Sequence, residues 1–167
     1  MAPLKKIREL EKYLKYEFKK RKYQNRALTH STFTNEQKQK RKTSKKFPDQ
    51  EIYSTFGDAI LKTIFIDLLM ERGLSTKEEI TKQKEALESN DNLAEVGKRL
   101  KLIENKLIKF GKGAKNQVDQ GGERFLADTV EAIVAAIFID TGYSYNKTKK
   151  CIKRLFKSDL DKLSLCC

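Results

Sequence analysis

Carboxylates recur at helical spacing in two distant segments of the chain. Glu51, Ser54 and Asp58 are separated by three and four residues, so a helix places them on one face. Asp128 and Glu131 share a helical face in the same way. Carboxylates that lie close together raise one another's pKa unless a cation neutralises them. If the two helices meet, the pattern predicts a cation-binding site between them.

Magnesium is the cation that suits such a cluster. Mg²⁺ prefers oxygen ligands, takes one or two protein carboxylates and keeps waters or phosphate oxygens as its other ligands. The ion lowers the pKa of an attacking water and offsets charge on a leaving oxygen, and a second ion can bind about 4 Å away. The carboxylates therefore predict a phosphodiesterase site, with Mn²⁺ as the alternative ion.

Acids at these spacings are also typical of solvated helix faces, which is the alternative interpretation. Two local features favour a site. Gly57 lies inside the predicted helix, at a cost of about 1 kcal/mol relative to Ala. Asp58 lies within an otherwise strongly apolar stretch.

The elements that must position these acids are predicted to be helices. Ser75 and Glu78 show a capping-box pattern, and Gly73 and Gly142 are typical helix ends. No alternating strand pattern and no repeat is found, which predicts an all-α fold in a single domain over residues 1–167. Apolar spacing and boundary residues predict helices at 4–18, 23–33, 50–72, 75–89, 91–101, 124–140 and 145–163.

The composition favours a polyanion as partner. Of the 167 residues, 36 are Lys or Arg and 23 are Asp or Glu, which gives a net charge of +13. No apolar run is long enough to span a bilayer and no signal-peptide core is present, so we expect an intracellular protein, in cytoplasm or nucleus, without a membrane partner. Cys151, Cys166 and Cys167 form no metal-ligand spacing with His30, which fits a reducing compartment, and the terminal Cys pair is interpreted as a plain tail rather than a lipidation signal.

Six short motifs together resemble the ribonuclease III family in order and spacing, over nearly the whole chain from Leu10 to about Phe156. The blocks around Gly57-Asp58 and Ala127-Asp128 are more specific together than either alone. The motifs are Ala27-Leu28-Thr29-His30-Ser31, Phe56-Gly57-Asp58-Ala59-Ile60-Leu61, Ile80-Thr81-Lys82-Gln83-Lys84, Leu87-Glu88-Ser89-Asn90, Gly111-Lys112-Gly113 and Leu126-Ala127-Asp128-Thr129-Val130-Glu131-Ala132.

The resemblance implies a helical endonuclease-domain bundle, usually a homodimer, that cuts double-stranded RNA with Mg²⁺ and leaves 5′-phosphates and short 3′ overhangs. By similarity, Asp58 and Glu131 are the catalytic acids, and Asp58, Asp128 and Glu131 are the metal ligands. His30 matches a structural position of the family, so packing or capping is expected of it rather than general-base catalysis.

The chain departs from the family at two helix positions. Ser54 stands where the family has a glutamate, and a hydroxyl is a far weaker Mg²⁺ ligand than a carboxylate. Thr55 replaces an aromatic residue that in this family packs into the partner subunit. Glu51, and Glu88 at a usually apolar position, are candidate replacement metal ligands, with plain surface charge as the alternative.

No double-stranded RNA-binding domain follows in the sequence, so the basic surplus is expected to hold RNA. A solvated basic loop is predicted over residues 35–48, longer than is usual in the family, and its contacts with phosphate are expected to be blind to sequence. A solvated loop without this role is the alternative. The predicted RNA-binding residues are Lys38, Lys40, Arg41, Lys42, Lys45 and Lys46, with Lys112 in the Gly111–Gly113 turn as a weaker candidate.

Three functions fit this sequence. The first is an active endoribonuclease, which we favour. The second is a weakened family member that binds structured RNA within a larger complex, and the third is dimerisation with a complete partner. Only Ser54 separates the first two, because a compensating acid would restore the missing ligand.

Overall fold

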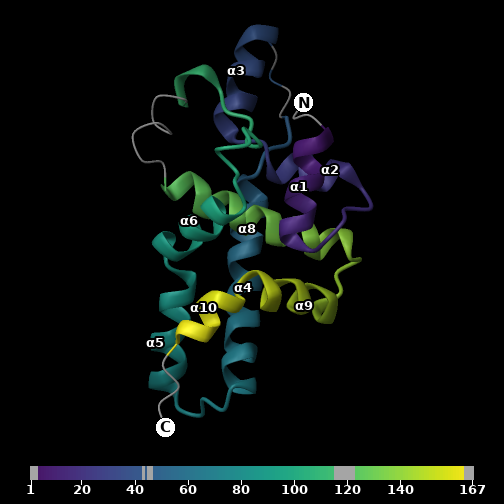
Figure 1. The fold of residues 1–167 in the computed structure, drawn as a ribbon. Coiled ribbons are helices and arrows are strands. Elements are labelled where there is room, and N and C mark those ends of the chain that lie inside the picture. Colours follow the sequence, from purple (N-terminus) through teal and green to yellow (C-terminus); the bar gives the residue numbers. More distant parts are fainter. Residues whose placement is uncertain (1–3, 43, 45–46, 115–122, 164–167) are drawn as a thin grey trace.

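The computed structural model describes residues 4–42, 44, 47–114 and 123–163. Within these ranges the chain forms helices and no strand, which confirms the all-α prediction, and only an isolated bridge joins Thr29 to Lys109 (Figure 1). None of the described helices combines the length and the hydropathy that crossing a bilayer requires. The helices are α1 Leu4–Leu14, α2 Arg21–Ala27, α3 Ser31–Arg41, α4 Glu51–Glu71, α5 Lys77–Glu88, α6 Asn90–Arg99, α8 Glu123–Asp140, α9 Tyr145–Leu155 and α10 Lys157–Lys162.

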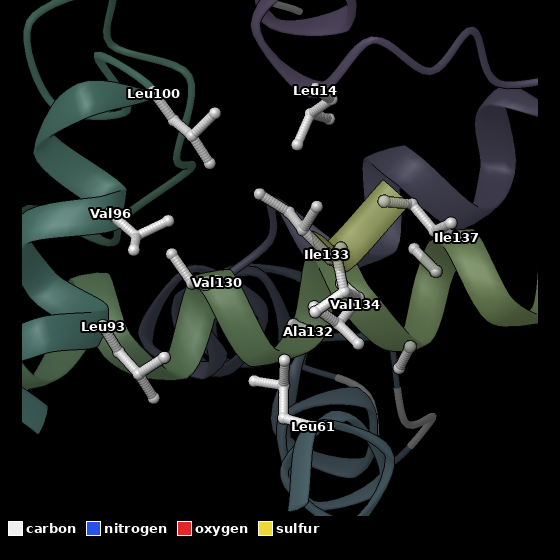
Figure 2. Close-up of a cluster of buried hydrophobic side chains, with 14 of the residues drawn as sticks. Leu14, Leu61, Leu93, Val96, Leu100, Val130, Ala132, Ile133, Val134 and Ile137 are labelled. Atoms are coloured by element: carbon white, nitrogen blue, oxygen red, sulfur yellow. The ribbon is translucent and has the colours of Figure 1, made fainter. Parts of the chain in front are cut away.

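Helix α8 forms the centre of the core. Its side chains are apolar around most of its circumference, which is the pattern of a helix enclosed by others. In Figure 2 its Val and Ile side chains lie among leucines from three other parts of the chain. The labelled residues are Leu14, Leu61, Leu93, Val96, Leu100, Val130, Ala132, Ile133, Val134 and Ile137.

Helix α4 crosses α8 and makes the most extensive packing contact in the described chain (Figure 1). The sequence predicted both helices within one residue of their observed limits at every end. Gly57 of α4 lies against the backbone of α8, where an added Cβ would be 1.8 Å from the Glu131 carbonyl oxygen. The two carboxylate-bearing helices therefore meet at Gly57.

A buried carboxylate ties the end of α8 to the N-terminal helices. Asp140 accepts hydrogen bonds from the backbone N–H groups of Lys19 and Lys20, at 2.8 and 2.9 Å, and from the Tyr16 hydroxyl at 2.7 Å. These bonds satisfy backbone donors of the two residues that precede α2, which have no partner within that helix. Burial and the bond to Asp140 raise the pKa of Tyr16 far above its usual value of 10.0.

The predicted helix at 23–33 is wrong, because the chain leaves helical geometry at residues 28–30. Helix α2 ends at Ala27, Lys109 donates its N–H to the Leu28 carbonyl, and His30 donates to the Lys109 carbonyl. The His30 ring then accepts a hydrogen bond from the Thr32 N–H at 3.2 Å and caps α3. The expected packing or capping role of His30 is therefore confirmed.

The predicted basic loop at 35–48 is wrong over its first half, because α3 continues to Arg41. The segment lacks apolar residues, but helices also form when polar contacts anchor them. Buried Thr34 donates a 3.0 Å hydrogen bond to Asp49, and the Gly111 N–H donates to Thr32 at 3.2 Å. Lys38, Lys40 and Arg41 thus lie in the last turn of a helix, where cations are favoured by its dipole. Lys45 and Lys46 lie outside the described residues.

Other helix boundaries also differ from prediction. The predicted helix at 4–18 ends at Leu14, and Lys15 after it has a positive φ of 50°. The capping box consists of Thr76 and Glu79, one residue later than the predicted pair. The predicted final helix is split into α9 and α10 at Phe156, a fully buried residue that packs edge-on against Phe65. Cys166 and Cys167 lie outside the described residues.

Candidate active site

The crossing of α4 and α8 places Glu131 beside Asp58 and the Ser54 hydroxyl of the facing helix. Burial, followed by repulsion from Asp58 and Asp128, raises the pKa of the Glu131 carboxyl from 4.5 to about 7. A hydrogen bond from the Ser54 hydroxyl and the charge of Lys62 act in the opposite direction. Glu131 of α8 therefore lies close enough to Asp58 of α4 and to Asp128 for their charges to disfavour its ionised form.

Asp58 lies one turn after Ser54 on α4 and is partly exposed. Its carboxylate forms a 2.8 Å ion pair with the ammonium of Lys62, four residues further along the same helix. The bond to Asp58 raises the pKa of Lys62, and the charges of Glu88 and Glu131 add to that effect. Lys62 was not predicted from the sequence, although its spacing from Asp58 is the signal that would have found it.

Glu88 ends α5 and joins the same cluster. Its Oε1 atom lies 2.7 Å from the ammonium of Lys84, and that pair is mostly buried, with 18% and 19% of the two side chains exposed. Its Oε2 atom is buried and has no hydrogen-bond partner within the described residues. A buried carboxylate oxygen without a partner is costly unless a cation occupies the space beside it. Glu88 is therefore not a plain surface charge.

Glu51 and Asp128 line a polar cleft of about 270 Å³ on the other side of Ser54. Burial raises the pKa of Asp128, whereas the charges of Arg124 and His30 lower it. Ser54 both lines this cleft and bonds to Glu131, so it lies between the two groups of acids. The lining residues are His30, Ser31, Gln50, Glu51, Ser54, Thr55, Arg124 and Asp128.

The donor chemistry of this site fits Mg²⁺. Within the described residues no three His, Cys, Asp or Glu side chains form a ready-made cage for a metal ion. Mg²⁺ does not need one, because it commonly takes one or two protein carboxylates and fills its octahedron with water and phosphate oxygens. The unpartnered Oε2 of Glu88 and the repulsion among Asp58, Asp128 and Glu131 are both relieved by a divalent cation.

The structure also relates Lys112 to α3. Glu36 of α3 pairs with Lys40 at 2.6 Å and accepts a 2.8 Å hydrogen bond from the Lys112 N–H. Two of the predicted RNA-binding residues therefore lie at one carboxylate. In Figure 1 α3 projects from one end of the molecule, with residues 111–114 beside it. Arg41, Lys42 and Lys112 are exposed there.

Comparison with known proteins gives consistent matches. A family model described as Ribonuclease-III-like matches residues 20–160. Ribonuclease 3 of Clostridium kluyveri is 35% identical over 157 residues, which cover 92% of this chain and 59% of the relative. Ribonuclease 3 of Aquifex aeolicus is 28% identical over 158 residues, which cover 94% of this chain and 63% of the relative. The chain thus spans about three fifths of the length of these bacterial relatives.

Solved structures match over almost their full length. Two structures of the nuclease domain of ribonuclease III from Campylobacter jejuni superpose with a TM-score of 0.78 each. Sequence identities are 26% and 25%, and the matches cover 93% and 95% of this chain and 99% and 98% of those domains. One of these two structures shows structural flexibility in a region involved in dimer formation. The relatives named here are bacterial, so they give no support to the nuclear alternative.

Proposed function

Because this chain belongs to the ribonuclease-III-like family, we propose that it is a Mg²⁺-dependent endoribonuclease that cuts double-stranded RNA and leaves 5′-phosphates and short 3′ overhangs. The observation that carries the proposal is the group of Asp58, Glu88 and Glu131, contributed by three different helices, α4, α5 and α8. All three carboxylates raise the pKa of Lys62, Asp58 chiefly through a hydrogen bond and Glu88 and Glu131 through their charges. Acids on separate solvated helix faces would not gather around one lysine.

Asp58 and Glu131 are the proposed catalytic acids and would hold Mg²⁺ together with Asp128. When bound, the ion supplies a water of lowered pKa and offsets charge on the leaving oxygen. The chain's own contribution is position, because the close approach of Gly57, the neighbour of Asp58, to the Glu131 backbone fixes where the two helices cross. Ser54 holds the Glu131 carboxylate through its hydroxyl.

Glu88 is the proposed replacement for the carboxylate that the family has at position 54. Its partly buried position and its unpartnered oxygen support this role. Glu51 remains a second candidate on the side of the cleft, where it faces Asp128. The competing function is RNA binding without cleavage, and the observation that favours it is the neutral hydroxyl of Ser54 in the position of a metal ligand.

Cleavage of long double-stranded RNA in Mg²⁺ tests two points in one assay. The first is the nuclease activity itself, and the second is the replacement of the missing carboxylate at position 54 by Glu88. We expect the wild-type chain to cut, and Glu88→Gln to lower the rate at least about tenfold because one metal-facing carboxylate is lost. Adding Ser54→Glu to Glu88→Gln should restore activity, because the carboxylate returns at the neighbouring position. Glu95→Gln, which removes an exposed acid paired with Lys98 on α6, is the matched control and should cut like wild type.

The competing function gives a different result in the same assay. A chain that binds the RNA but cuts it only after Ser54→Glu would show that Glu88 does not compensate. Product ends report on the reaction type, since hydrolysis of the expected kind leaves 5′-phosphates. If the Glu88→Gln variant cuts at the wild-type rate, Glu88 does not belong to the proposed site.

The cations at the C-terminal end of α3 are the proposed contact with the RNA backbone. Replacing Lys38, Arg41 and Lys42 by Gln should weaken RNA binding and flatten its dependence on salt, by about 0.7 to 0.9 in log–log slope for each phosphate that the variant no longer neutralises. Lys40 is left intact because Glu36 already holds it. A triple Gln variant of Lys147, Lys150 and Arg154 on α9 removes the same charge elsewhere. Equal slopes for the two variants would contradict a specific role for α3.

The proposed oligomer is a homodimer formed through an apolar face of α4. Ile52 and Phe56 are 58% and 37% exposed although they lie beside the site. Phe56 contacts Phe138 with ring centroids 5.7 Å apart, and Phe138 contacts Tyr143, which is 63% exposed. Exposed aromatic and aliphatic side chains grouped in this way are typical of protein interfaces.

A further inference from the structure

The acids of the site are neutralised by two lysines of the same chain. Lys62 of α4 lies 2.8 Å from Asp58, and Lys84 of α5 lies 2.7 Å from Glu88. Both pairs have the i,i+4 spacing that brings side chains together on a helix. The sequence therefore places a positive charge one turn away from two of the proposed metal-facing carboxylates.

The two lysines differ in how much of their side chains is exposed to solvent. Lys84 has 19% of its side chain exposed, and its partner Glu88 has 18% exposed, so this pair is mostly buried. Lys62 has 45% exposed, and Asp58 has 38%. A lysine ammonium on a flexible four-carbon stem can turn into solvent when its partner is taken by another cation. Lys62 has the room to do so, whereas Lys84 does not.

Lys62 interacts with carboxylates from all three helices of the site. It bonds to Asp58 of α4, and the carboxylates of Glu88 on α5 and Glu131 on α8 attract it. These are the groups that the proposed function assigns to Mg²⁺. An ammonium and a divalent ion repel each other strongly at such short range outside bulk water.

We infer that Lys62 is a built-in counter-cation that neutralises the carboxylate cluster when no divalent ion is bound and is displaced when one binds. This inference rests on the proposed metal site. Lys62 thereby lowers the affinity of the site for divalent ions, while it holds Asp58 close to Glu88 and Glu131 in their absence. It is a positioning residue, since it acts through the carboxylates.

Direct metal binding tests the inference without any cleavage assay. Free Mn²⁺ is measured by electron paramagnetic resonance in the presence of the full chain, and Mg²⁺ affinity follows from competition. We expect Lys62→Gln to lower the apparent Kd for Mn²⁺ about tenfold, because one positive charge leaves the site. Lys62→Arg keeps the charge and should keep the wild-type affinity. Lys98→Gln, which breaks a surface pair with Glu95, should change nothing.

Thermal unfolding gives a second readout that separates counter-charge from simple damage. Without metal, Lys62→Gln should melt below wild type because the carboxylates lose a neutralising charge. In saturating Mn²⁺ the order should reverse. A Kd for Lys62→Gln equal to or weaker than that of wild type overturns the role of Lys62 and leaves the metal site standing. Absence of Mn²⁺ binding in wild type and in every variant overturns both.

Discussion

Glu131→Gln should reduce cleavage of double-stranded RNA by about 10³-fold or more, because a neutral amide is a poor ligand for a hard divalent ion and the proposed reaction depends on that ion. The substitution keeps the size of the side chain and its place on α8. It also removes the acid that Asp58 and Asp128 repel. Rates are measured with RNA in excess and Mg²⁺ at several concentrations, so that weakened metal binding is separated from lost turnover.

The same substitution should stabilise the metal-free protein, which excludes unfolding as the cause of the lost activity. The pKa of the Glu131 carboxyl is raised from 4.5 to about 7 in the folded chain. The folded state therefore binds this proton more tightly than the unfolded state, and the free energy of unfolding falls as the pH rises between these two values. At about pH 8 the ionised carboxyl costs on the order of 3 kcal/mol, and Glu131→Gln removes that cost.

Denaturant unfolding at two pH values checks this linkage. The stability gain of Glu131→Gln should be present at about pH 8 and absent below the unfolded-state pKa, where wild-type Glu131 is protonated in both states. Glu95→Gln, an exposed acid of α6, should show no gain of this kind. A variant that loses both activity and stability at high pH would contradict the assignment of Glu131 to a repulsive metal-binding cluster.

Gly57→Ala should destabilise the protein by about 3 kcal/mol, near the upper end of the usual cost of overpacking. The added Cβ would lie 1.8 Å from the carbonyl oxygen and 2.5 Å from the carbonyl carbon of Glu131. Both are backbone atoms, so no side-chain rotation relieves the clash and the two helices must separate. The gain in helix propensity, about 1 kcal/mol, is too small to offset this. Activity should fall as well, because the displacement moves Asp58 and Glu131 apart.

Two other glycines supply a graded control. At Gly97 an added Cβ would meet side-chain atoms of Leu126 at 3.0 Å, which can shift at smaller cost. At Gly113 an added Cβ meets nothing within 4 Å. The loss of stability measured by denaturant unfolding should therefore be largest for Gly57→Ala, intermediate for Gly97→Ala and smallest for Gly113→Ala. A neutral Gly57→Ala would show that α4 and α8 do not meet at this glycine.

Several elements could be predicted from the sequence because each carries its own pattern of burial. Helices α4 and α8 pack against the core over their whole length, so their apolar residues define them closely. The segment that forms α3 has almost no such pattern, and its helix depends on His30, on Thr34 with Asp49, and on contacts with Gly111. The break at Phe156 is equally invisible, since the apolar pattern continues across it.

The candidate site also has one part that the sequence determines and another that only the tertiary structure decides. The sequence determines the acids that share a face of one helix, such as Asp128 with Glu131, because local geometry fixes their separation. The tertiary structure alone decides that Glu88 of α5 approaches Lys62 of α4, and that Gly57 admits the backbone of α8. Periodicity records which face of a helix is buried, but the helix that covers it is chosen by packing between residues far apart in the chain. The carboxylates and the Asp58–Lys62 pair were therefore predictable, whereas the approach of Glu88 and Glu131 to that pair and the close crossing of α4 and α8 were not.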